Sequence, residues 1–384
     1  MSETLARNQP RQAIEKALGR SQIVALLGPR QCGKTTLARS FSVPPGNYLD
    51  LERTADRSAL AASAESTLGA LTGLVVIDEI QELPQLFPTL RVLADREPLR
   101  ARFLILGSVS PELIRGASET LAGRVEFVPL GGFTLEEVST RRAELLWQRG
   151  GFPRSFLAAD DADSFAWRSH FIDTFLTRDA ARLGIALAPE ALRCFWIMLA
   201  HLHGGLANAA ELARTVAVTQ ATASKYIDVL THAFLLRRLS PWHANVRKRL
   251  VKSPKLYLRD SGILHALLGL RDPGEVLAHP RMGWSWEGFA LEQVLAAAGP
   301  GEAWFYATHG GAELDLLLQR GGRRHGFEFR FTDAPATHKS MHIARADLDL
   351  AKLWVVYRGE RAFALAPGIE ALPLQSVPEA VRSL

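Results

Sequence analysis

Cysteine and long apolar runs are both scarce in this sequence. Only Cys32 and Cys194 occur among 384 residues, too few for a disulfide framework or a cysteine-based zinc site. Apolar runs such as residues 74–77 and 103–106 are strand-sized, whereas a membrane helix needs about 20 residues. Charged side chains interrupt the N-terminal segment, which argues against a secretory signal. These absences predict a soluble, cytoplasmic protein with no membrane partner.

Acidic side chains are missing from one stretch of the chain. Residues 237–259 contain eight Lys or Arg and no Asp or Glu, in a protein of net charge +5. Such a stretch is either a solvated surface or an electrostatic footprint for a polyanion. The remaining composition is ordinary, with 47% apolar and 22% charged residues, so long disordered segments are not expected. The length predicts two or three domains.

Short apolar runs alternate with helical patterns up to about residue 129. Such alternation predicts a parallel sheet covered by helices on both faces. The expected strands are residues 23–27, 48–51, 74–77, 103–106 and 125–128, and the clearest helices are residues 55–70 and 110–121.

The rest of the chain changes character twice. Residues 141–200 have helical spacing and no strand signal, and residues 208–239 then follow the helix, turn, helix, strand order of a winged helix-turn-helix. After residue 254 a mixed α/β pattern returns, with candidate strands at residues 304–306, 314–318, 326–331 and 353–357. We therefore expect an α/β fold with a parallel-sheet domain (1–140), a helical lid (141–203), a winged helix (204–243) and a mixed α/β domain (244–384).

One glycine-rich motif carries the chemistry of phosphate binding. Residues 28–35 read Gly-Pro-Arg-Gln-Cys-Gly-Lys-Thr, directly after an expected strand. In this P-loop pattern the glycines let backbone N–H groups curl around a phosphate, and the following helix begins at the same anion. We expect Lys34 to bridge the β- and γ-phosphates of ATP and Thr35 to bind Mg²⁺. The predicted nucleotide contacts are Gly28, Pro29, Arg30, Gln31, Cys32, Gly33, Lys34, Thr35 and Thr36.

Two carboxylates follow the apolar run at residues 74–77. Asp78 and Glu79 would be costly at the end of a buried strand unless a cation or a proton transfer uses them. We expect Asp78 to complete the Mg²⁺ shell and Glu79 to polarise the attacking water. Together with residues 28–35, this pair predicts ATP hydrolysis rather than nucleotide binding alone.

These two motifs resemble those of AAA+ ATPases. The resemblance implies a polar residue beside the attacking water, here Ser108, although family members more often have Asn there. It also implies an arginine finger that acts on the ATP of a neighbouring subunit; Arg124 fits this position, and Arg115 is the competitor. A surface salt bridge is the alternative for either arginine. The turn that ends at Pro153 is similar to the Gly-x-Pro turn with which some ATPase lids touch adenine. The resemblance finally implies a homo-oligomeric ring, which would be hexameric.

Four residues near the C-terminus resemble a second family. Glu287 on an expected helix, Asp315 on a strand, and Glu328 with Arg330 on the next strand follow the order of the PD-(D/E)XK nucleases. In those enzymes three acids bind Mg²⁺ and a lysine orients the water. Arg330 replaces that lysine here, and arginine cannot exchange a proton. We expect a degenerate nuclease site in an endonuclease-like domain that binds without cleaving; an active nuclease and an accidental pattern are the alternatives.

The expected winged helix is the candidate DNA contact. Thr219 is a suitable N-cap for its second helix, whose first turns meet base edges in such domains. The cations that follow would contact phosphates. The predicted DNA-binding residues are Thr222, Ser224, Lys225, Arg247, Lys248, Arg249 and Lys252. A protein-docking or interdomain role is the alternative for this module.

The order of these parts resembles one large prokaryotic group of AAA+ ATPases. Motifs and order together predict an ATPase that uses ATP and Mg²⁺ to remodel, or move along, duplex or branched DNA. Two alternatives stay open. One is a regulatory switch in which ATP or ADP controls binding of a protein partner, and the other is an ATP-gated nuclease.

Overall fold

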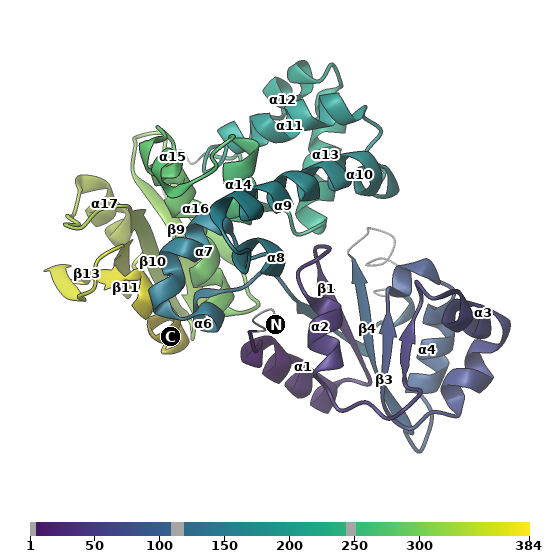
Figure 1. Cartoon of the computed structure of the whole chain (residues 1–384). Helices are drawn as coiled ribbons and strands as arrows, with labels where there is room; N and C mark the ends of the chain where they lie inside the picture. The colour runs from purple at the N-terminus through teal and green to yellow at the C-terminus, as the bar shows by residue number, and fades with distance from the viewer. Residues whose placement is uncertain (1–4, 109–118, 243–250) are drawn as a thin grey trace. The chain divides into compact units, whose positions relative to one another are not determined.

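The structure is a computed structural model that describes residues 5–108, 119–242 and 251–384. The chain forms two compact units, whose elements are labelled in Figure 1. The first unit consists of Met1–Phe133, Phe152–Arg154 and Asp228–Leu235, and the second of Thr134–Gly151, Ser155–Ile227 and Leu236–Leu384. Among the described helices, none is both long and apolar enough to cross a lipid bilayer.

The first unit contains a five-stranded parallel sheet in the order β2-β3-β4-β1-β5. Its strands, which confirm the predicted alternation, are β1 (Ile23–Gly28), β2 (Tyr48–Asp50), β3 (Gly73–Asp78), β4 (Ala101–Ser108) and β5 (Val125–Pro129). The helices described around it are α1 (Asn8–Arg20), α2 (Lys34–Arg39), α3 (Thr54–Gly69), α4 (Leu86–Ala94) and the short η1 (Ile80–Glu82). Positions 110–118 of one predicted helix lie outside the described residues.

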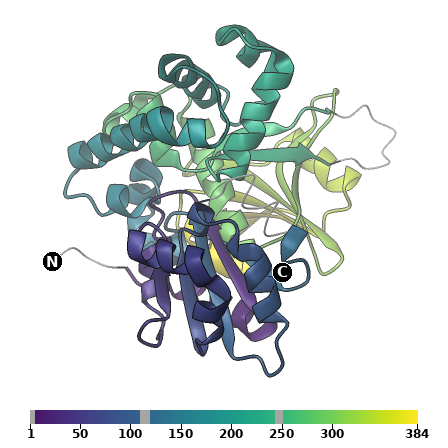
Figure 2. The ribbon, with the colours of Figure 1, turned by 90° about the vertical axis from the view of Figure 1, so that its right-hand side faces the viewer.

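Helices cover both faces of this sheet (Figure 1 and Figure 2). Ala25 of β1 belongs to the same core as Leu60 of α3 and Leu90 of α4. The next residue along the strand is Leu26, which is also fully buried, as is Ile14 of α1. Because successive strand residues point to opposite faces, a continuous apolar run is what a sheet covered on both sides requires.

The parallel arrangement brings the predicted functional segments to one edge of the sheet. β1 ends at Gly28, which is paired with Ser108 at the end of β4. β3 ends at Asp78, which is paired with Asp50 at the end of β2. Since the carboxyl ends of parallel strands meet at a common edge, where α/β proteins bind ligands, the phosphate loop and the Asp78–Glu79 pair lie together.

The second unit contains an eight-stranded mixed sheet in the order β12-β13-β11-β10-β9-β8-β6-β7. The four strands predicted after residue 254 are all present. β9 and β10 form a hairpin, whose two-residue turn, Gly321 and Gly322, has φ angles of 54° and 77°, as tight hairpins require. The strands are β6 (Leu236–Pro241), β7 (Lys255–Leu258), β8 (Ala303–Ala307), β9 (Glu313–Arg320), β10 (Arg323–Arg330), β11 (Lys352–Tyr357), β12 (Phe363–Ala366) and β13 (Ile369–Pro373).

Helices make up the predicted lid segment and flank the second sheet. α8 and α13 each contain residues of both units. The α-helices are α6 (Leu135–Val138), α7 (Ala143–Arg149), α8 (Pro153–Phe156), α9 (Asp161–Thr174), α10 (Ala180–Arg182), α11 (Pro189–His201), α12 (Ala209–Thr215), α13 (Gln220–His232), α14 (Ser261–Leu267), α15 (Pro273–Ala278), α16 (Met282–Ala298), α17 (Lys339–Asp347) and α18 (Val377–Arg382). Shorter turns of helix are η2 (Thr140–Arg142), η3 (Phe175–Asp179) and η4 (Leu374–Ser376).

α12, a short turn and α13 occupy the segment predicted as a helix-turn-helix. Thr219 Oγ1 accepts a hydrogen bond from the Thr222 N–H at 3.1 Å, as expected of the N-cap. β6 then pairs antiparallel with β7 and also parallel with β8. The hairpin after α13 is therefore part of the eight-stranded sheet. The predicted domain boundaries stay predictions, and the one at residue 243 falls between two neighbouring strands of that sheet.

Candidate functional site

Residues 28–35 run from the end of β1 through a tight loop into the first turn of α2. A Cβ at Gly28 would lie 2.0 Å from the carbonyl oxygen of Leu130, so only glycine fits there. Gln31 and Gly33 have φ angles of 62° and 98°, in the left-handed region that bends the backbone sharply. Bends of this kind create concave runs of N–H groups that bind anions.

Lys34 places a positive charge inside this loop. The side chain is 6% exposed, and its Nζ donates hydrogen bonds to the carbonyl oxygens of Gly28 at 3.0 Å and Pro29 at 2.9 Å. The hydroxyl of Thr35 donates to Asp78 Oδ2 at 2.9 Å, which joins the loop to the end of β3. Of the other predicted contacts, Cys32 is buried, Arg30 is half-buried, and Gln31 and Thr36 are exposed.

Asp78 is buried and holds three hydrogen bonds. Besides Thr35, the hydroxyl of Tyr48 donates to Oδ2 at 2.7 Å, and the N–H of Glu79 donates to Oδ1 at 3.0 Å. Burial, reinforced by Asp78, raises the pKa of Tyr48, so this hydroxyl keeps its proton and remains a donor. The role of Tyr48 was not predicted, because its contact with Asp78 depends on the pairing of β2 with β3.

Glu79 adopts a left-handed conformation, with φ 55° and ψ 47°. The side-chain amide of Gln81 donates a hydrogen bond to Glu79 Oε2, while Ile80 between them is buried in the core. Burial raises the pKa of Glu79, and the Gln81 hydrogen bond and the charge of Lys34 oppose that rise. Gln81 Oε1 is buried and has no hydrogen-bond partner within the described segments. Sequence reasoning missed Gln81, although it lies only two positions after Glu79.

Arg7, which precedes α1, is hydrogen-bonded to the phosphate loop. Its guanidinium donates to the carbonyl oxygens of Cys32 at 3.0 Å, Gly131 at 3.0 Å and Gly132 at 2.8 Å. One side chain thus joins the loop to the segment that follows β5. The sequence carried no signal for this contact, because the bonded residues are 25 and more than 100 positions away.

Ser108 and Arg124 lie at opposite ends of the strands. The backbone of Ser108 is paired with that of Gly28, next to the loop. Arg124 precedes β5 and makes a two-pronged ion pair with Asp95, with nitrogen–oxygen distances of 2.6 and 2.8 Å. Arg124 is therefore remote from the loop of its own chain. Its finger role stays a prediction, and the competing Arg115 lies outside the described residues.

Pro153 lies beside the phosphate loop. Its Cγ is 3.8 Å from the position of a Cβ built at Gly33, and both residues belong to the first unit. Contact of Pro153 with adenine stays a prediction.

The structure brings the four predicted nuclease-type residues together in the second unit. Glu287 on α16, Asp315 on β9 and Glu328 on β10 are 8%, 5% and 2% exposed. Arg330 lies 3.5 Å from Asp315 Oδ2 and 2.5 Å from Glu328 Oε2. The spacing of these residues in the sequence thus corresponds to side chains that lie close together in the structure.

A residue absent from that prediction lies among them. Lys255 Nζ is 2.6 Å from Glu313 Oε1, 3.6 Å from Glu287 Oε1 and 3.7 Å from Asp315 Oδ1, and Tyr257 donates to Glu287 at 2.7 Å. Burial and the charge of Asp315 raise the pKa of Glu287 to about 7. In the sequence, Lys255 was recognisable only as one of the basic residues of the stretch 237–259.

This cluster does not fit the divalent metal that the nuclease resemblance implies. Lys255 and Arg330 contact its carboxylates, so those oxygens already have positively charged partners. Across residues 5–108, 119–242 and 251–384, no three His, Cys, Asp or Glu side chains are arranged to hold a metal ion. No metal-dependent cleavage step is derived from these residues.

The predicted DNA contacts are only partly described. Thr222 and Ser224 are half-buried on α13, while Lys225 and Lys252 are exposed. The hydroxyls of Thr222 and Thr219 are 2.8 Å apart. Arg247, Lys248 and Arg249 lie outside the described residues.

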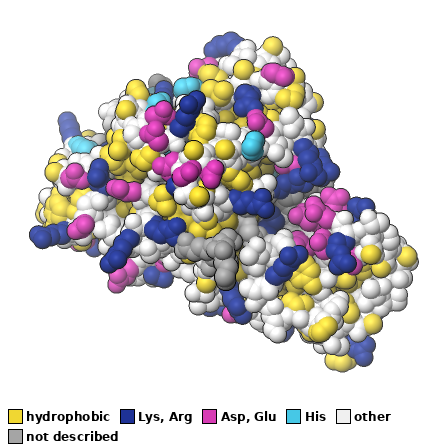
Figure 3. All heavy atoms as spheres, in the orientation of Figure 1, with side chains coloured by type: hydrophobic (Ala, Val, Ile, Leu, Met, Phe, Trp, Pro, Cys, Tyr) yellow, Lys and Arg dark blue, Asp and Glu magenta, His cyan; other side chains and the backbone are white. Residues whose placement is uncertain are grey.

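The basic stretch has acidic neighbours in the structure, although its own sequence contains none. Arg237 and Arg259 both form ion pairs with Glu292 of α16, and Lys255 contacts the cluster described above. The acids come from distant parts of the chain, so a local count of charges could not find them. Figure 3 shows the same mixing of signs, with basic and acidic side chains interspersed over the visible face.

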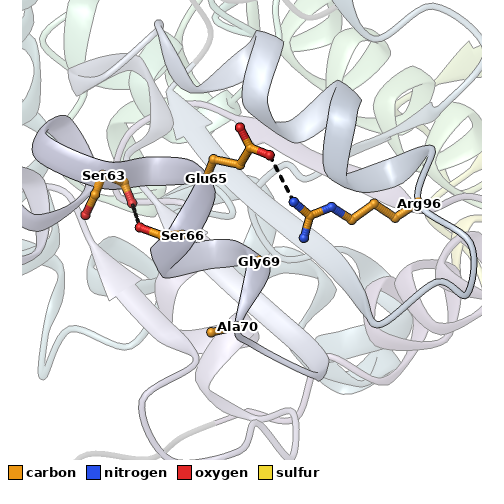
Figure 4. Close-up of a pocket in the computed structure, with 6 residues that line it drawn as sticks. All are labelled: Ser63, Glu65, Ser66, Gly69, Ala70 and Arg96. Atoms are coloured by element: carbon orange, nitrogen blue, oxygen red, sulfur yellow. Dashed lines mark hydrogen bonds and ion pairs between the residues drawn. The ribbon is translucent and has the colours of Figure 1, made fainter.

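An open hollow of about 570 Å³ lies in the first unit (Figure 4). Arg96 and Glu65 form an ion pair of 3.0 Å at its side. Its lining is Ser63, Glu65, Ser66, Gly69, Ala70 and Arg96. Ala70 precedes β3 and Arg96 precedes β4, so the hollow lies at the amino-terminal edge of the sheet, opposite to the phosphate loop.

Family models match three segments of the chain. A model described as an AAA domain matches residues 20–139. Two models described as domains of unknown function match residues 140–274 and 282–377. The first match covers the phosphate loop and the parallel sheet, and supports a P-loop ATPase domain of the AAA type.

Two mycobacterial proteins are similar to nearly the whole chain. The uncharacterized proteins Rv2008c of Mycobacterium tuberculosis and Mb2031c of Mycobacterium bovis are each 48% identical over 366 residues, which is 95% of this chain and 82% of theirs. Among solved structures, the Walker-type ATPase paby2304 of Pyrococcus abyssi has a TM-score of 0.49 and 14% identity, and the match covers 69% of this chain and 96% of that one. The similarity to the two mycobacterial proteins is high enough to place this chain in the same family.

Proposed function

Because this chain belongs to the family of the two mycobacterial proteins and carries an AAA domain, we propose that it is a DNA-binding ATPase that couples Mg²⁺-dependent ATP hydrolysis to remodelling of, or translocation on, duplex or branched DNA. One observation carries the ATPase part. Lys34 and Thr35 of the phosphate loop lie at the same sheet edge as the carboxylates that follow β3, joined by the Thr35–Asp78 hydrogen bond of 2.9 Å.

The residues present fit a nucleotide and its metal ion. The loop combines a left-handed Gly33 with a buried ammonium on Lys34, the two features that accommodate β- and γ-phosphates. Thr35 and Asp78 would hold Mg²⁺, which when bound neutralises charge on the phosphate oxygens. Tyr48 fixes the carboxylate of Asp78 through its hydrogen bond of 2.7 Å.

Glu79 is the base in the proposed reaction. Its carboxylate takes a proton from a water molecule, and the water oxygen forms a bond to the γ-phosphorus. The bond from that phosphorus to the β–γ bridging oxygen breaks, which releases ADP and phosphate. Burial raises the pKa of Glu79 and so makes it a stronger base, while Gln81 and Lys34 help to keep it ionised.

The DNA part of the proposal rests on the segment from α12 to β7. A helix-turn-helix with a capped second helix is followed by an antiparallel strand pair, the order found in winged helices. Lys225 and Lys252 are exposed in this segment and are available to phosphates, which supply most of the affinity of such domains. A switch that binds a protein partner instead is the rival proposal for the same surface.

The experiment that tests the proposal measures ATP turnover with and without DNA. Wild-type protein should hydrolyse Mg²⁺–ATP, and single-stranded, duplex or four-way DNA should stimulate it. Glu79→Gln should bind ATP yet barely turn it over, and Lys34→Ala should not bind. Wild-type turnover by Glu79→Gln would reject the assigned base. Hydrolysis that no DNA changes, combined with no DNA binding, would favour the regulatory switch.

The salt dependence of DNA binding locates the contact. If Arg247, Lys248 and Arg249 neutralise phosphates, replacing all three with Ala should reduce the log–log salt slope by about two to three units. The matched control replaces the exposed cations Lys16, Arg91 and Arg102 of the first unit, and should keep the wild-type slope. An unchanged slope in the first triple variant would remove this basic run from the DNA site.

A further inference from the structure

A buried lysine lies at the centre of the acidic cluster in the second unit. Lys255 begins β7, and only 6% of the residue is exposed. Its ammonium is within 3.7 Å of carboxylate oxygens of Glu287, Glu313 and Asp315. These acids come from α16 and β9, so a single side chain joins three elements of the fold.

The charges of the neighbouring acids explain why the ammonium of Lys255 is stable at this buried position. Four acidic side chains, those of Glu287, Glu313, Asp315 and Glu328, are in contact with two cations of the described residues, Lys255 and Arg330, and burial raises the pKa of Glu287 and Glu328. Burying a carboxylate without a positive partner is costly. Removing Lys255 would leave one of these two cations for four acidic side chains, which would then take up protons or another positive ion.

The backbone holds Lys255 in this position from both sides. On one side Lys255 is paired with Leu239 of β6. On the other it forms an isolated bridge with Leu206, and the N–H of Ala207 donates to the carbonyl of Pro254 at 2.7 Å. The ammonium therefore cannot leave the cluster by a simple shift of a loose loop.

We propose that Lys255 is the resident cation of this site, occupying the place among Glu287, Glu313 and Asp315 that would otherwise attract a divalent metal ion. Loss of its charge converts the cluster into a divalent cation site. The nuclease resemblance does not give this role, because there the lysine follows the strand acid at the position of Arg330. With Lys255 in place, the cluster is an ion-pair network that ties β7 to β9 and α16. The proposal does not depend on ATP hydrolysis.

Mn²⁺ binding to the nucleotide-free, full-length protein, measured by isothermal titration calorimetry, tests this inference. Wild type and Asp315→Asn should give the same isotherm. Lys255→Gln should bind Mn²⁺ about tenfold more tightly or better than wild type, because one positive charge is lost within 4 Å of the acids. Adding Asp315→Asn to Lys255→Gln should abolish the gain.

A matched control removes a lysine from an ion pair on the same sheet. Lys352 of β11 lies 2.7 Å from Glu370, and Lys352→Gln should bind Mn²⁺ like wild type. Wild-type binding that depends on Asp315 and is as tight as that of Lys255→Gln would overturn the proposal. Binding of Mn²⁺ by Lys255→Gln that is no tighter than wild type would overturn it equally. If Lys255→Gln does not fold, Lys255→Gln with Glu313→Gln restores one unit of charge balance and should still bind Mn²⁺ more tightly than wild type.

Discussion

At the scale of single residues, the contact between Gln81 and Glu79 has a measurable effect on the acid side of the pH profile. Burial raises the pKa of Glu79, and the hydrogen bond from Gln81 counteracts it. Gln81→Leu removes that bond, so the pKa of Glu79 should rise further. A smaller fraction of Glu79 is then ionised at any given pH, and the acid limb of kcat should move to higher pH.

The measurement is kcat at saturating Mg²⁺–ATP from pH 5 to pH 9. Gln85→Leu is the control, since Gln85 is exposed four positions further along the chain. A merely structural role of Gln81 would lower kcat equally at every pH. An unshifted acid limb in Gln81→Leu would therefore contradict the positioning role.

Site residues were predictable from the sequence where the residues that act together are adjacent along the chain. Residues 28–35 and the Asp78–Glu79 pair form continuous motifs, because a phosphate loop and a strand end are local structures. Tyr48, Arg7 and Lys255 reach their partners through strand pairing and loop packing. Their roles required the tertiary structure.

At the scale of elements, three helices of the second unit are joined by a buried chain of hydrogen bonds. Trp147 of α7 donates to Ser285 Oγ of α16 at 3.0 Å, and Ser285 Oγ is 2.7 Å from His265 Nε2 of α14. His265 Nδ1 is 2.9 Å from the carbonyl of Gln148. A carbonyl oxygen only accepts, so Nδ1 carries the proton and Nε2 accepts from Ser285. With His265 neutral, every hydrogen bond of this chain has one donor and one acceptor.

This chain predicts a loss of stability at acidic pH. Burial lowers the pKa of His265 from 6.5 to about 4, so the unfolded state binds more protons than the folded state between those values. The free energy of unfolding should therefore fall as pH decreases below 6.5. His265→Gln should reduce that slope by up to about 1.4 kcal/mol per pH unit, as measured by denaturant unfolding.

The control for this prediction is His170→Gln, which changes an exposed histidine of α9 and should keep the wild-type slope. The buried His203, whose pKa burial lowers to about 3, also contributes, so some acid sensitivity should persist in His265→Gln. Identical slopes for wild type and His265→Gln would refute the prediction.

Strands that alternate with helical patterns were predicted, whereas β7, β12 and β13 of the second sheet were not. The five strands of the first sheet are apolar runs separated by helical patterns, and both features survive in the sequence. β7 has only four residues inside the basic stretch, and β12 is largely exposed. All four residues of β7 are nonetheless buried, which the basic sequence around it does not indicate. Arg237 and Arg259 point toward Glu292, with which both form ion pairs. Glu292 lies 55 positions after Arg237 and 33 positions after Arg259, so the sequence did not indicate these contacts.

At the scale of the whole molecule, the position of Arg124 predicts assembly. It lies at the edge of the sheet opposite to its own phosphate loop and is paired with Asp95, so it can act on ATP only when a neighbouring subunit presents it. We expect ATP to promote a ring-like oligomer, which would be hexameric by family resemblance. Mass photometry with and without ATP measures this.

Mixing variants tests whether the finger acts between subunits. Arg124→Ala and Glu79→Gln should each be inactive alone, and their mixture should regain part of the activity at interfaces that combine an intact Arg124 with an intact Glu79. Arg193→Ala, which removes an exposed arginine paired with Asp173, is the matched control and should stay active. A strictly monomeric wild type with full turnover would rule out this assembly.

The tight packing of Gly28 affects how a genetic screen of this protein should be interpreted. A side chain there would collide with the Leu130 backbone at 2.0 Å, so substitutions of Gly28 separate β1 from the segment after β5 whether or not nucleotide is present. For Lys34 no such collision arises, since the hydrogen bonds of its side chain to described residues are to the loop carbonyls of Gly28 and Pro29. Loss-of-function alleles at Gly28 would therefore be detected as reduced protein abundance, whereas alleles at Lys34 would leave abundance unchanged and report the nucleotide requirement of the phenotype.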